Sequence, residues 1–392
     1  MIRESFKNLA FNLFLLCFGV LVALVLLELG VRALGLYHAP TEDFVEPHPR
    51  LGWHHEPNKV GYWTIGDQRI PVRINSKGLR DKEYSYKKEE NIFRILVLGD
   101  SFTEAFQVPL NDSFCKVLER RLNQENRRFE VINAGLGGVG TDYELLFLKR
   151  EGFRYDPDLI LVAFFPNDVL ENYRSKEILN SMEGEQALYY GKEGFAVTLK
   201  QFLAEHSHAF NYFGLLAIEH IPGLTHLLVD LQLIGAVPVE KEANGIPLHY
   251  SVLAEEYSSQ IKEAWMITAL IFEKLAKEVR TRDDRLAVVS IPYREQVYES
   301  LWDQQLTRPE MRQRKWDLSK PDELLAERLH SIGVPLLRLL PEFKKFSRHQ
   351  ALYYGVDGKI SDGHWNVAGH QLAGRLIYQW LVREELIPSK KP

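Results

Sequence analysis

Two blocks far apart in the sequence contain the residue types of nucleophilic ester chemistry. Ser101 follows Gly-Asp, so a sharp turn there would expose its hydroxyl group. Asp362 lies two positions before His364, close enough for a carboxylate to fix the tautomer of the imidazole. A serine activated by such a base can attack an ester carbonyl. Each block alone is also an ordinary turn.

Two further blocks supply hydrogen-bond donors. Residues 133–140 read NAGLGGVG, a loop that exposes backbone N–H groups just before a predicted helix. Asn167 follows Phe-Pro and offers a side-chain amide. Together, the four blocks provide a nucleophile, a base, an orienting acid and donors for an oxyanion, which acyl transfer requires. The carboxylates that adjoin two of the blocks, Asp100 and Asp168, are expected to hold loops by hydrogen bonds rather than to react.

The glycine loop also matches the dinucleotide-binding pattern G-x-G-x-x-G, from Gly135 to Gly140. It follows the second predicted strand instead of the first. Asp156 and Asp158 begin the next strand instead of ending it, where a ribose would lie. The sequence therefore favours an oxyanion loop and predicts no cofactor.

The elements that must position these blocks alternate between strands and helices. Apolar runs predict buried strands at 93–98, 129–133, 158–165, 286–291 and 334–338. Helical periodicity follows at 112–126, 141–151, 255–281, 322–331 and 367–385. This alternation predicts a flavodoxin-like three-layer α/β/α sandwich with a five-stranded parallel sheet. The four blocks would gather at the carboxyl edge of that sheet, where such folds bind ligands.

One N-terminal transmembrane helix is predicted to precede this fold. Residues 9–27 carry no charge and would span roughly 28 Å, about one hydrocarbon core. Arg3 and Lys7 precede the run and Glu28 follows it, so the N-terminus is expected in the cytoplasm and the catalytic domain outside it, in the periplasm of a bacterium. A cleaved signal peptide and a buried helix are the alternatives.

Three regions are expected along the chain. Residues 1–37 form the anchor, 38–90 a linker and short-strand strap, and 91–392 the catalytic domain with an insertion at 169–254. Three roles remain open for the insertion: a lid, a substrate-binding segment and a membrane-surface hairpin. The net charge of −5 argues against a nucleic-acid partner.

Other polar and aromatic groups receive weaker interpretations. The groups His54-His55-Glu56 and His206-x-His208 are interpreted as solvated surface, since neither has a third ligand at the defined spacing of a metal site. No metal site is therefore predicted. Core or interface packing is expected for four aromatic residues that would otherwise suggest a sugar groove: Trp53, Trp63, Tyr189 and Tyr190.

The four blocks resemble those of the SGNH (GDSL-type) hydrolase superfamily, in the same order, over about residues 92–385. The resemblance implies that Ser101 is the nucleophile, His364 the base and Asp362 the acid. It also implies an oxyanion hole made by the backbone N–H groups of Ser101 and Gly138 and the side chain of Asn167.

One spacing departs from the superfamily pattern. Many members have Asp-x-x-His, whereas here Asp362-x-His364 is followed by Trp365. This shorter block is similar to that of SGNH proteins that acetylate exopolysaccharides such as alginate. Asp357 is the substitute candidate for the acid.

The sequence therefore predicts a membrane-anchored serine esterase that removes O-acyl groups, in particular O-acetyl groups, from an extracytoplasmic glycan. An O-acyltransferase of the same fold is one alternative, and its acetyl donor would need a separate partner. A non-catalytic glycan-binding or scaffold component of an envelope assembly is the other. Expected partners are an acylated glycan or small ester and, through residues 9–27, the membrane.

Overall fold

The computed structural model describes residues 2–35, 44–124, 128–174, 203, 207–210, 212–213, 242, 245–358, 360 and 362–388. The chain divides into two compact units. The first comprises Met1–Pro40 and Tyr190–Val239, and the second comprises Thr41–Tyr189 and Glu240–Pro392. The four sequence blocks that contain Ser101, Gly138, Asn167 and His364 all belong to the second unit.

A five-stranded parallel sheet forms the centre of the second unit, with the order β6-β5-β7-β8-β9. Its strands are β5 (Phe93–Gly99), β6 (Phe129–Gly135), β7 (Leu159–Phe164), β8 (Arg285–Ser290) and β9 (Leu336–Arg338). The apolar side chains of β5 and β7 are almost fully buried, as expected for central strands covered on both faces. The order is that of a flavodoxin-like sheet, so the predicted fold is confirmed.

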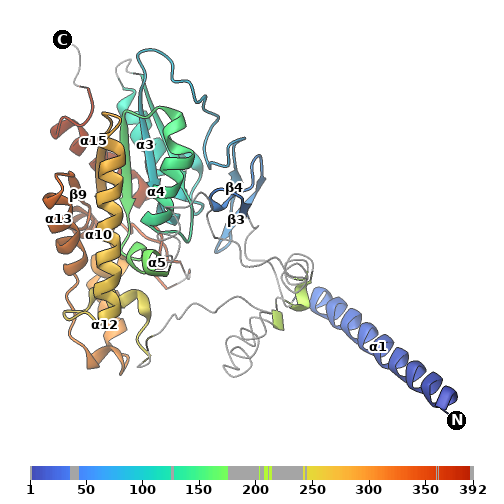
Figure 1. Ribbon diagram of the computed structural model, residues 1–392. Helices are drawn as coiled ribbons and strands as arrows, with labels where there is room; N and C mark the ends of the chain where they lie inside the picture. The colour runs from blue at the N-terminus through green and yellow to red at the C-terminus, as the bar shows by residue number, and fades with distance from the viewer. Residues whose placement is uncertain are drawn as a thin grey trace. The chain divides into compact units, whose positions relative to one another are not determined.

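Helices cover both faces of this sheet (Figure 1). On one side α3 (Phe114–Leu122) packs against α15 (Val367–Arg383). On the other, α10 (Ser259–Arg280) runs alongside α4 (Thr141–Arg150) and α5 (Asp168–Arg174). Side-chain caps begin several of them, since Ser113, Ser258 and Asn366 each accept a backbone N–H from the first turn of α3, α10 and α15. The remaining helices are α2 (Ser101–Glu104), α11 (Arg294–Val297), α12 (Glu299–Leu306), α13 (Lys320–Ser331) and α14 (Leu340–Ser347).

Two antiparallel hairpins precede the sheet and pack next to the first catalytic block. They consist of β1 (Val45–His48) with β2 (Gly52–His55) and β3 (Val60–Ile65) with β4 (Gln68–Arg73). Phe44, Val72 and Ile74 form a small apolar cluster with Phe106, which lies just after α2. This cluster ties the strap to the segment that carries Ser101.

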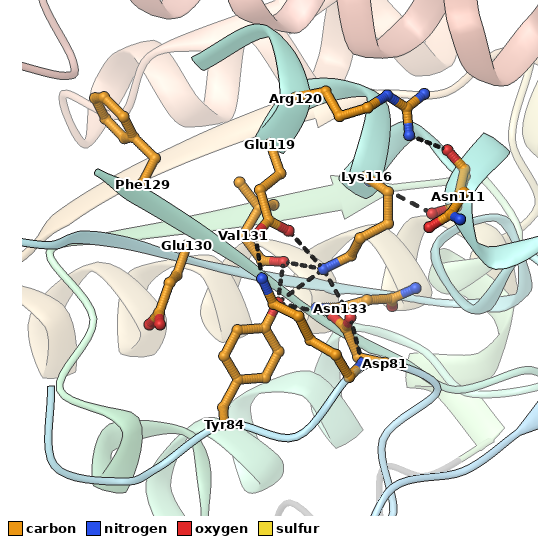
Figure 2. A network of polar contacts seen from close by, with 12 residues as sticks. Asp81, Tyr84, Asn111, Lys116, Glu119, Arg120, Phe129, Glu130, Val131 and Asn133 are labelled. Atoms are coloured by element: carbon orange, nitrogen blue, oxygen red, sulfur yellow. Dashed lines mark hydrogen bonds and ion pairs between the residues drawn. The ribbon is translucent and has the colours of Figure 1, made fainter. Parts of the chain in front are cut away.

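A buried lysine joins the strap to the sheet and to α3 (Figure 2). Nζ of Lys116 lies 2.7 Å from Asp81 and 2.9 Å from Glu119, and it donates to the hydroxyl of Tyr84 at 2.8 Å. Burial alone would lower the pKa of Lys116, but the charges of Asp81 and Glu119 raise it. Asp81 also accepts from the backbone N–H of Asn133, where the glycine loop begins. Removing one partner of such a pair typically costs about 3–5 kcal/mol.

The first unit contains α1 (Ile2–Ala33), whose segment Phe11–Ala33 is long and apolar enough to cross a membrane. A signal sequence has the same character, so the helix is a candidate for either role. The carboxylate of Glu28 accepts hydrogen bonds from Ser207, His208 and Ala209, which belong to the predicted insertion. Most of the insertion 169–254 lies outside the described residues.

Candidate active site

Ser101 opens the one-turn helix α2 directly after β5, at the carboxyl edge of the sheet. Asp100 caps this helix, because its Oδ1 accepts from the backbone N–H of Phe102 at 2.9 Å. Ala105 ends the helix with φ of +59°. Only glycine fits before the turn, since a Cβ on Gly99 would lie 2.1 Å from the hydroxyl of Thr103. The turn leaves Ser101 partly exposed, as its sequence predicts.

The structure brings Ser101, His364 and Asp362 into one hydrogen-bonded chain. Nε2 of His364 lies 2.8 Å from Oγ of Ser101. Nδ1 of the same ring lies 2.9 Å from Oδ1 of Asp362. The side chains of His364 and Asp362 are 26% and 18% exposed, so the chain of groups reaches solvent from a largely enclosed position. This is the geometry of a nucleophile, its base and an orienting acid.

The pKa shifts of His364 and Asp362 are those expected of a base that is hydrogen-bonded to a carboxylate. Burial alone would lower the pKa of His364, but the hydrogen bond and charge of Asp362 raise it above the ordinary 6.5. Burial alone would raise the pKa of Asp362, but its hydrogen bond to His364 and the His364 charge lower it, with a smaller contribution from Arg294. Asp362 therefore favours the imidazolium that forms when His364 takes a proton.

The loop that carries the acid and base is fixed on both sides. Tyr353 and Trp365 form an antiparallel bridge, and the backbone N–H of Tyr354 donates to the carbonyl of His364 at 2.9 Å. Trp365 is fully buried, so the residue after the base is part of the core. Nη1 of Arg294 donates to the carbonyl oxygen of Asp362 at 2.8 Å. Because Trp365 is fixed in the core, the short Asp-x-His-Trp block also fixes the position of the neighbouring His364 imidazole.

Two of the predicted oxyanion donors, Gly138 and Asn167, lie just after the strands that flank β5. Gly138 follows β6, is exposed and has φ of +76°, and no described atom lies within 4 Å of the position a Cβ would take. Asn167 follows β7, and its backbone carbonyl accepts from Leu170 and Glu171 in the first turns of α5. Oδ1 of Asn167 is buried without a hydrogen-bond partner among the described residues. Both residues therefore occupy the sheet edge from which Ser101 rises.

Three buried carboxyl groups lie in the elements behind this edge. Asp100 and Asp168 hold their own turns, as the sequence predicts, by accepting from Phe102 and Phe165. Glu144 in α4 was not predicted, and both its oxygens lack a partner among the described residues. Burial raises the pKa of Asp100 to about 7 and raises those of Glu144 and Asp168 well above their ordinary values. Burial therefore shifts all three carboxyl groups toward their uncharged forms.

The prediction that His54 and His55 form solvated surface is wrong. Both rings are buried, because β2 packs against the segment that follows Ser101 and against α4. His54 bonds to the hydroxyl of Tyr143, and His55 bonds to the carboxylate of Glu104, a second residue that the sequence did not single out. A doubled histidine in a four-residue strand gives no local sign of these partners.

The remaining expectations from the sequence concern metal binding by histidines and the packing of aromatic residues. The described residues hold no group of three or more His, Cys, Asp and Glu side chains placed to bind a metal ion. His206, Tyr189 and Tyr190 lie outside the described residues. Trp63 packs on Phe106, as the expectation of core packing predicts. Trp53, in contrast, is 43% exposed.

Comparisons with known proteins identify a protein family that this chain matches. The family model for GDSL-like lipase/acylhydrolase proteins matches residues 95–377. An arylesterase of Vibrio mimicus is 30% identical over 89 residues, which make up 23% of this chain and 44% of the arylesterase. The match thus spans less than half the length of that relative.

Solved structures with similarity to this chain include TesA, at 12% identity and a TM-score of 0.38, covering 74% of this chain and 97% of TesA. They also include a catalytic mutant of Axe2, an acetylxylan esterase from Geobacillus stearothermophilus. Its identity is 9% and its TM-score 0.38, with 73% of this chain and 93% of Axe2 covered.

Proposed function

The chain belongs to the GDSL-like lipase/acylhydrolase family, and we propose on this basis that it is a serine esterase with Ser101 as nucleophile, His364 as base and Asp362 as orienting acid. One observation carries the proposal. The hydroxyl of Ser101, the imidazole of His364 and the carboxylate of Asp362 form a single chain with spacings of 2.8 and 2.9 Å. A protein that only binds glycans has no need of this arrangement.

The proposed reaction has two halves. His364 takes the proton of Ser101 while Oγ attacks the ester carbonyl carbon, and the carbonyl electron pair moves onto oxygen. The tetrahedral intermediate then re-forms the carbonyl and expels the alcohol, which receives the proton from His364. In the second half, water gives its proton to His364 and attacks the acyl-enzyme. The carboxylic acid leaves and the proton returns to Ser101.

The oxyanion of each intermediate is proposed to lie between three donors. These are the backbone N–H groups of Ser101 and Gly138 and the side-chain amide of Asn167. Support comes from their placement, because Gly138 and Asn167 follow the strands on either side of β5. The loop is also open at Gly138, since a Cβ there would meet no described atom within 4 Å. Donors already in place stabilise the developing charge without reorganisation.

The substrate is proposed to be an O-acetyl ester on a glycan outside the cytoplasm. The placement is supported by the apolar helix Phe11–Ala33 and by the basic residues Arg3 and Lys7 before it. The acyl class is supported by the Asp362-x-His364-Trp365 block and its similarity to SGNH proteins that acetylate polysaccharides. The division into anchor 1–37, strap 38–90 and catalytic domain 91–392 is part of the same proposal.

The test uses the purified full chain in detergent and p-nitrophenyl esters of graded acyl length. The wild-type protein should hydrolyse the acetate ester with a higher kcat/KM than the octanoate ester. Ser101→Ala should lower kcat by a factor on the order of 10³ or more with little change in KM, because the hydroxyl acts in the transition state. Absence of any ester hydrolysis by the wild type, or retention of half of it by Ser101→Ala, would refute the proposal.

A second arm separates hydrolysis from transfer. An acetyl donor ester is supplied with and without glycan oligomers, and products are followed by mass. Release of free acetate at the same rate in both mixtures supports the esterase. Acetylated oligomers that form faster than acetate would favour the acyltransferase, which shares the same acyl-enzyme.

A further inference from the structure

His55 and Glu104 form a second buried histidine–carboxylate pair, outside the Ser101–His364–Asp362 chain. His55 lies in β2 of the strap, and Glu104 ends the helix that begins at Ser101. Nε2 of His55 is 2.7 Å from Oε1 of Glu104, and the two side chains are 1% and 7% exposed. The pair therefore joins the strap directly to the nucleophile segment.

The ring of His55 faces an oxygen acceptor on each side. Its Nδ1 lies 3.1 Å from the carbonyl oxygen of Gly78, which can only accept a hydrogen bond. Its Nε2 faces the carboxylate of Glu104. A hydrogen bond between an imidazole N–H and a carboxylate is charge-assisted, and such bonds are short and strongly directional. The position of the Glu104 carboxylate is thereby fixed from the strap.

The same carboxylate oxygen holds the glycine loop. Oε1 of Glu104 accepts the backbone N–H of Gly137 at 3.0 Å. Gly137 immediately precedes Gly138, whose N–H is the proposed oxyanion donor. Because the N–H of Gly137 is fixed on Glu104, the orientation of the following peptide unit depends on where that carboxylate lies.

Close packing adds to this dependence. A Cβ on Gly135 would lie 2.2 Å from the backbone nitrogen of Glu104, and one on Gly137 would lie 2.8 Å from its Oε2. The loop backbone thus presses on α2 at a distance that only glycine allows. From the strap, Nη1 of Arg80 also donates to the carbonyl oxygen of Glu104 at 2.8 Å.

We propose that His55 is a positioning residue that acts through Glu104 and Gly137 to set the oxyanion loop. The inference rests on the proposed esterase function and extends it. His55 lies outside residues 95–377, the part matched by the family model, so the strap completes the active site from outside that part. It touches neither the nucleophile nor the base.

The experiment compares three variants of the full chain in detergent: His55→Ala, His55→Gln and His54→Ala. His54 is the matched control, because it neighbours His55 in β2 and is also buried, but its ring bonds to Tyr143 and to the carbonyl of Lys77. The glutamine amide restores a donor toward Glu104. Kinetics use p-nitrophenyl acetate. Ethylboronic acid serves as a transition-state probe, because its tetrahedral adduct on Ser101 places an oxygen in the oxyanion hole.

His55→Ala should lower kcat by about tenfold to a hundredfold with KM little changed, somewhat less than the roughly 10²–10³ lost with a whole oxyanion donor. Affinity for the boronate should fall by a similar factor. His55→Gln should recover part of both losses, and His54→Ala should keep kcat within about twofold of the wild type. Hydrogen–deuterium exchange of residues 133–140 should increase in His55→Ala and not in His54→Ala.

An unchanged kcat in His55→Ala would overturn the inference, and so would an equal loss in His54→Ala. If His55→Ala does not fold, the comparison of His55→Gln with His54→Ala decides the question, since His55→Gln should retain a smaller loss that the control lacks. The exchange measurement does not depend on turnover. A wild-type chain without esterase activity would therefore refute the proposed function alone, and exchange at the glycine loop would still decide the positioning role.

Discussion

Oδ1 of Asp362 holds His364 twice, because it accepts the backbone N–H at 2.7 Å and faces Nδ1 of the ring at 2.9 Å. One oxygen thus fixes both the backbone and the tautomer of the base. Asp362→Asn should lower kcat by a factor on the order of 10³–10⁴, because an amide nitrogen in that place favours the wrong tautomer. Rates on p-nitrophenyl acetate measure the loss.

The matched control is Asp357→Asn on the same loop. Asp357 is exposed, so this substitution should leave kcat within about twofold of the wild type. A larger loss in Asp357→Asn than in Asp362→Asn would instead make Asp357 the orienting acid.

Asn167→Ala tests the side-chain oxyanion donor. Its kcat should fall by roughly 10²–10³, the usual cost of one such donor, while KM stays nearly constant. The amide is needed most when negative charge develops on the substrate oxygen, which is why the loss should appear in kcat. Steady-state kinetics on the acetate ester separate the two constants. A rise in KM alone would assign Asn167 to substrate binding.

The pH dependence of kcat/KM follows from the raised pKa of His364. The ring must be neutral to accept the proton of Ser101, so activity should increase as pH rises through that pKa. Because Asp362 raises the pKa, the midpoint of the acid limb should lie above the ordinary 6.5. Initial rates at low substrate concentration from pH 5 to 9 locate it. A midpoint below pH 6 would contradict the assignment of His364 as the base.

Glu144→Gln should change how stability depends on pH. The folded protein raises the pKa of Glu144 above its ordinary 4.5, while the unfolded chain releases this proton near that value. Above the unfolded pKa the folded state binds more protons, so stability falls as pH rises toward the folded value. The variant lacks this loss, so its stability relative to the wild type should increase between pH 5 and pH 8.

Urea unfolding followed by tryptophan fluorescence at the two pH values measures this difference. Comparing the variant with the wild type cancels the titrating groups outside the Asp100, Glu144 and Asp168 cluster, including His54 and His370, whose pKa values burial lowers to about 3. A variant that is less stable than the wild type at pH 8 would show that Glu144 is needed there in its charged form.

Membrane attachment is tested by fractionation of cells that produce the full chain with a C-terminal reporter active only outside the cytoplasm. The protein should remain with membranes after a carbonate wash, and the reporter should be active, because Phe11–Ala33 is long and apolar enough to span the bilayer. Release of an N-terminally shortened protein would identify a signal sequence. An inactive reporter would contradict the proposed orientation.

The fold was predictable because parallel strands covered on both faces appear as unbroken apolar runs. The runs at 93–98 and 129–133 differ from β5 and β6 only at their ends. Ser101, Asp362 and His364 could be proposed from the sequence because the four blocks together supply the groups for acyl transfer and resemble those of a known superfamily. The shortest strand, β9, begins two residues later than its predicted range 334–338 and pairs only with β8.

His55 and Glu144 could not be recognised in the same way. The partner of His55 lies 49 positions along the chain, so no spacing connects them. Glu144 lies in a helix whose residues 141–148 are all buried, and a carboxylate in such a helix looks in the sequence like an exposed position. Both roles are produced by packing between distant segments.

Ser101, the proposed nucleophile, and His364, the proposed base, are also synthesised at different times. Ser101 and His364 are 263 positions apart, and a ribosome adds about 5–20 residues per second, so roughly 13–53 seconds pass between their syntheses. During that interval the growing chain carries a serine without a base. Ester hydrolysis would therefore begin only after the C-terminal helix α15 has been made and has packed against α3. The onset of ester hydrolysis would therefore report that the fold is complete.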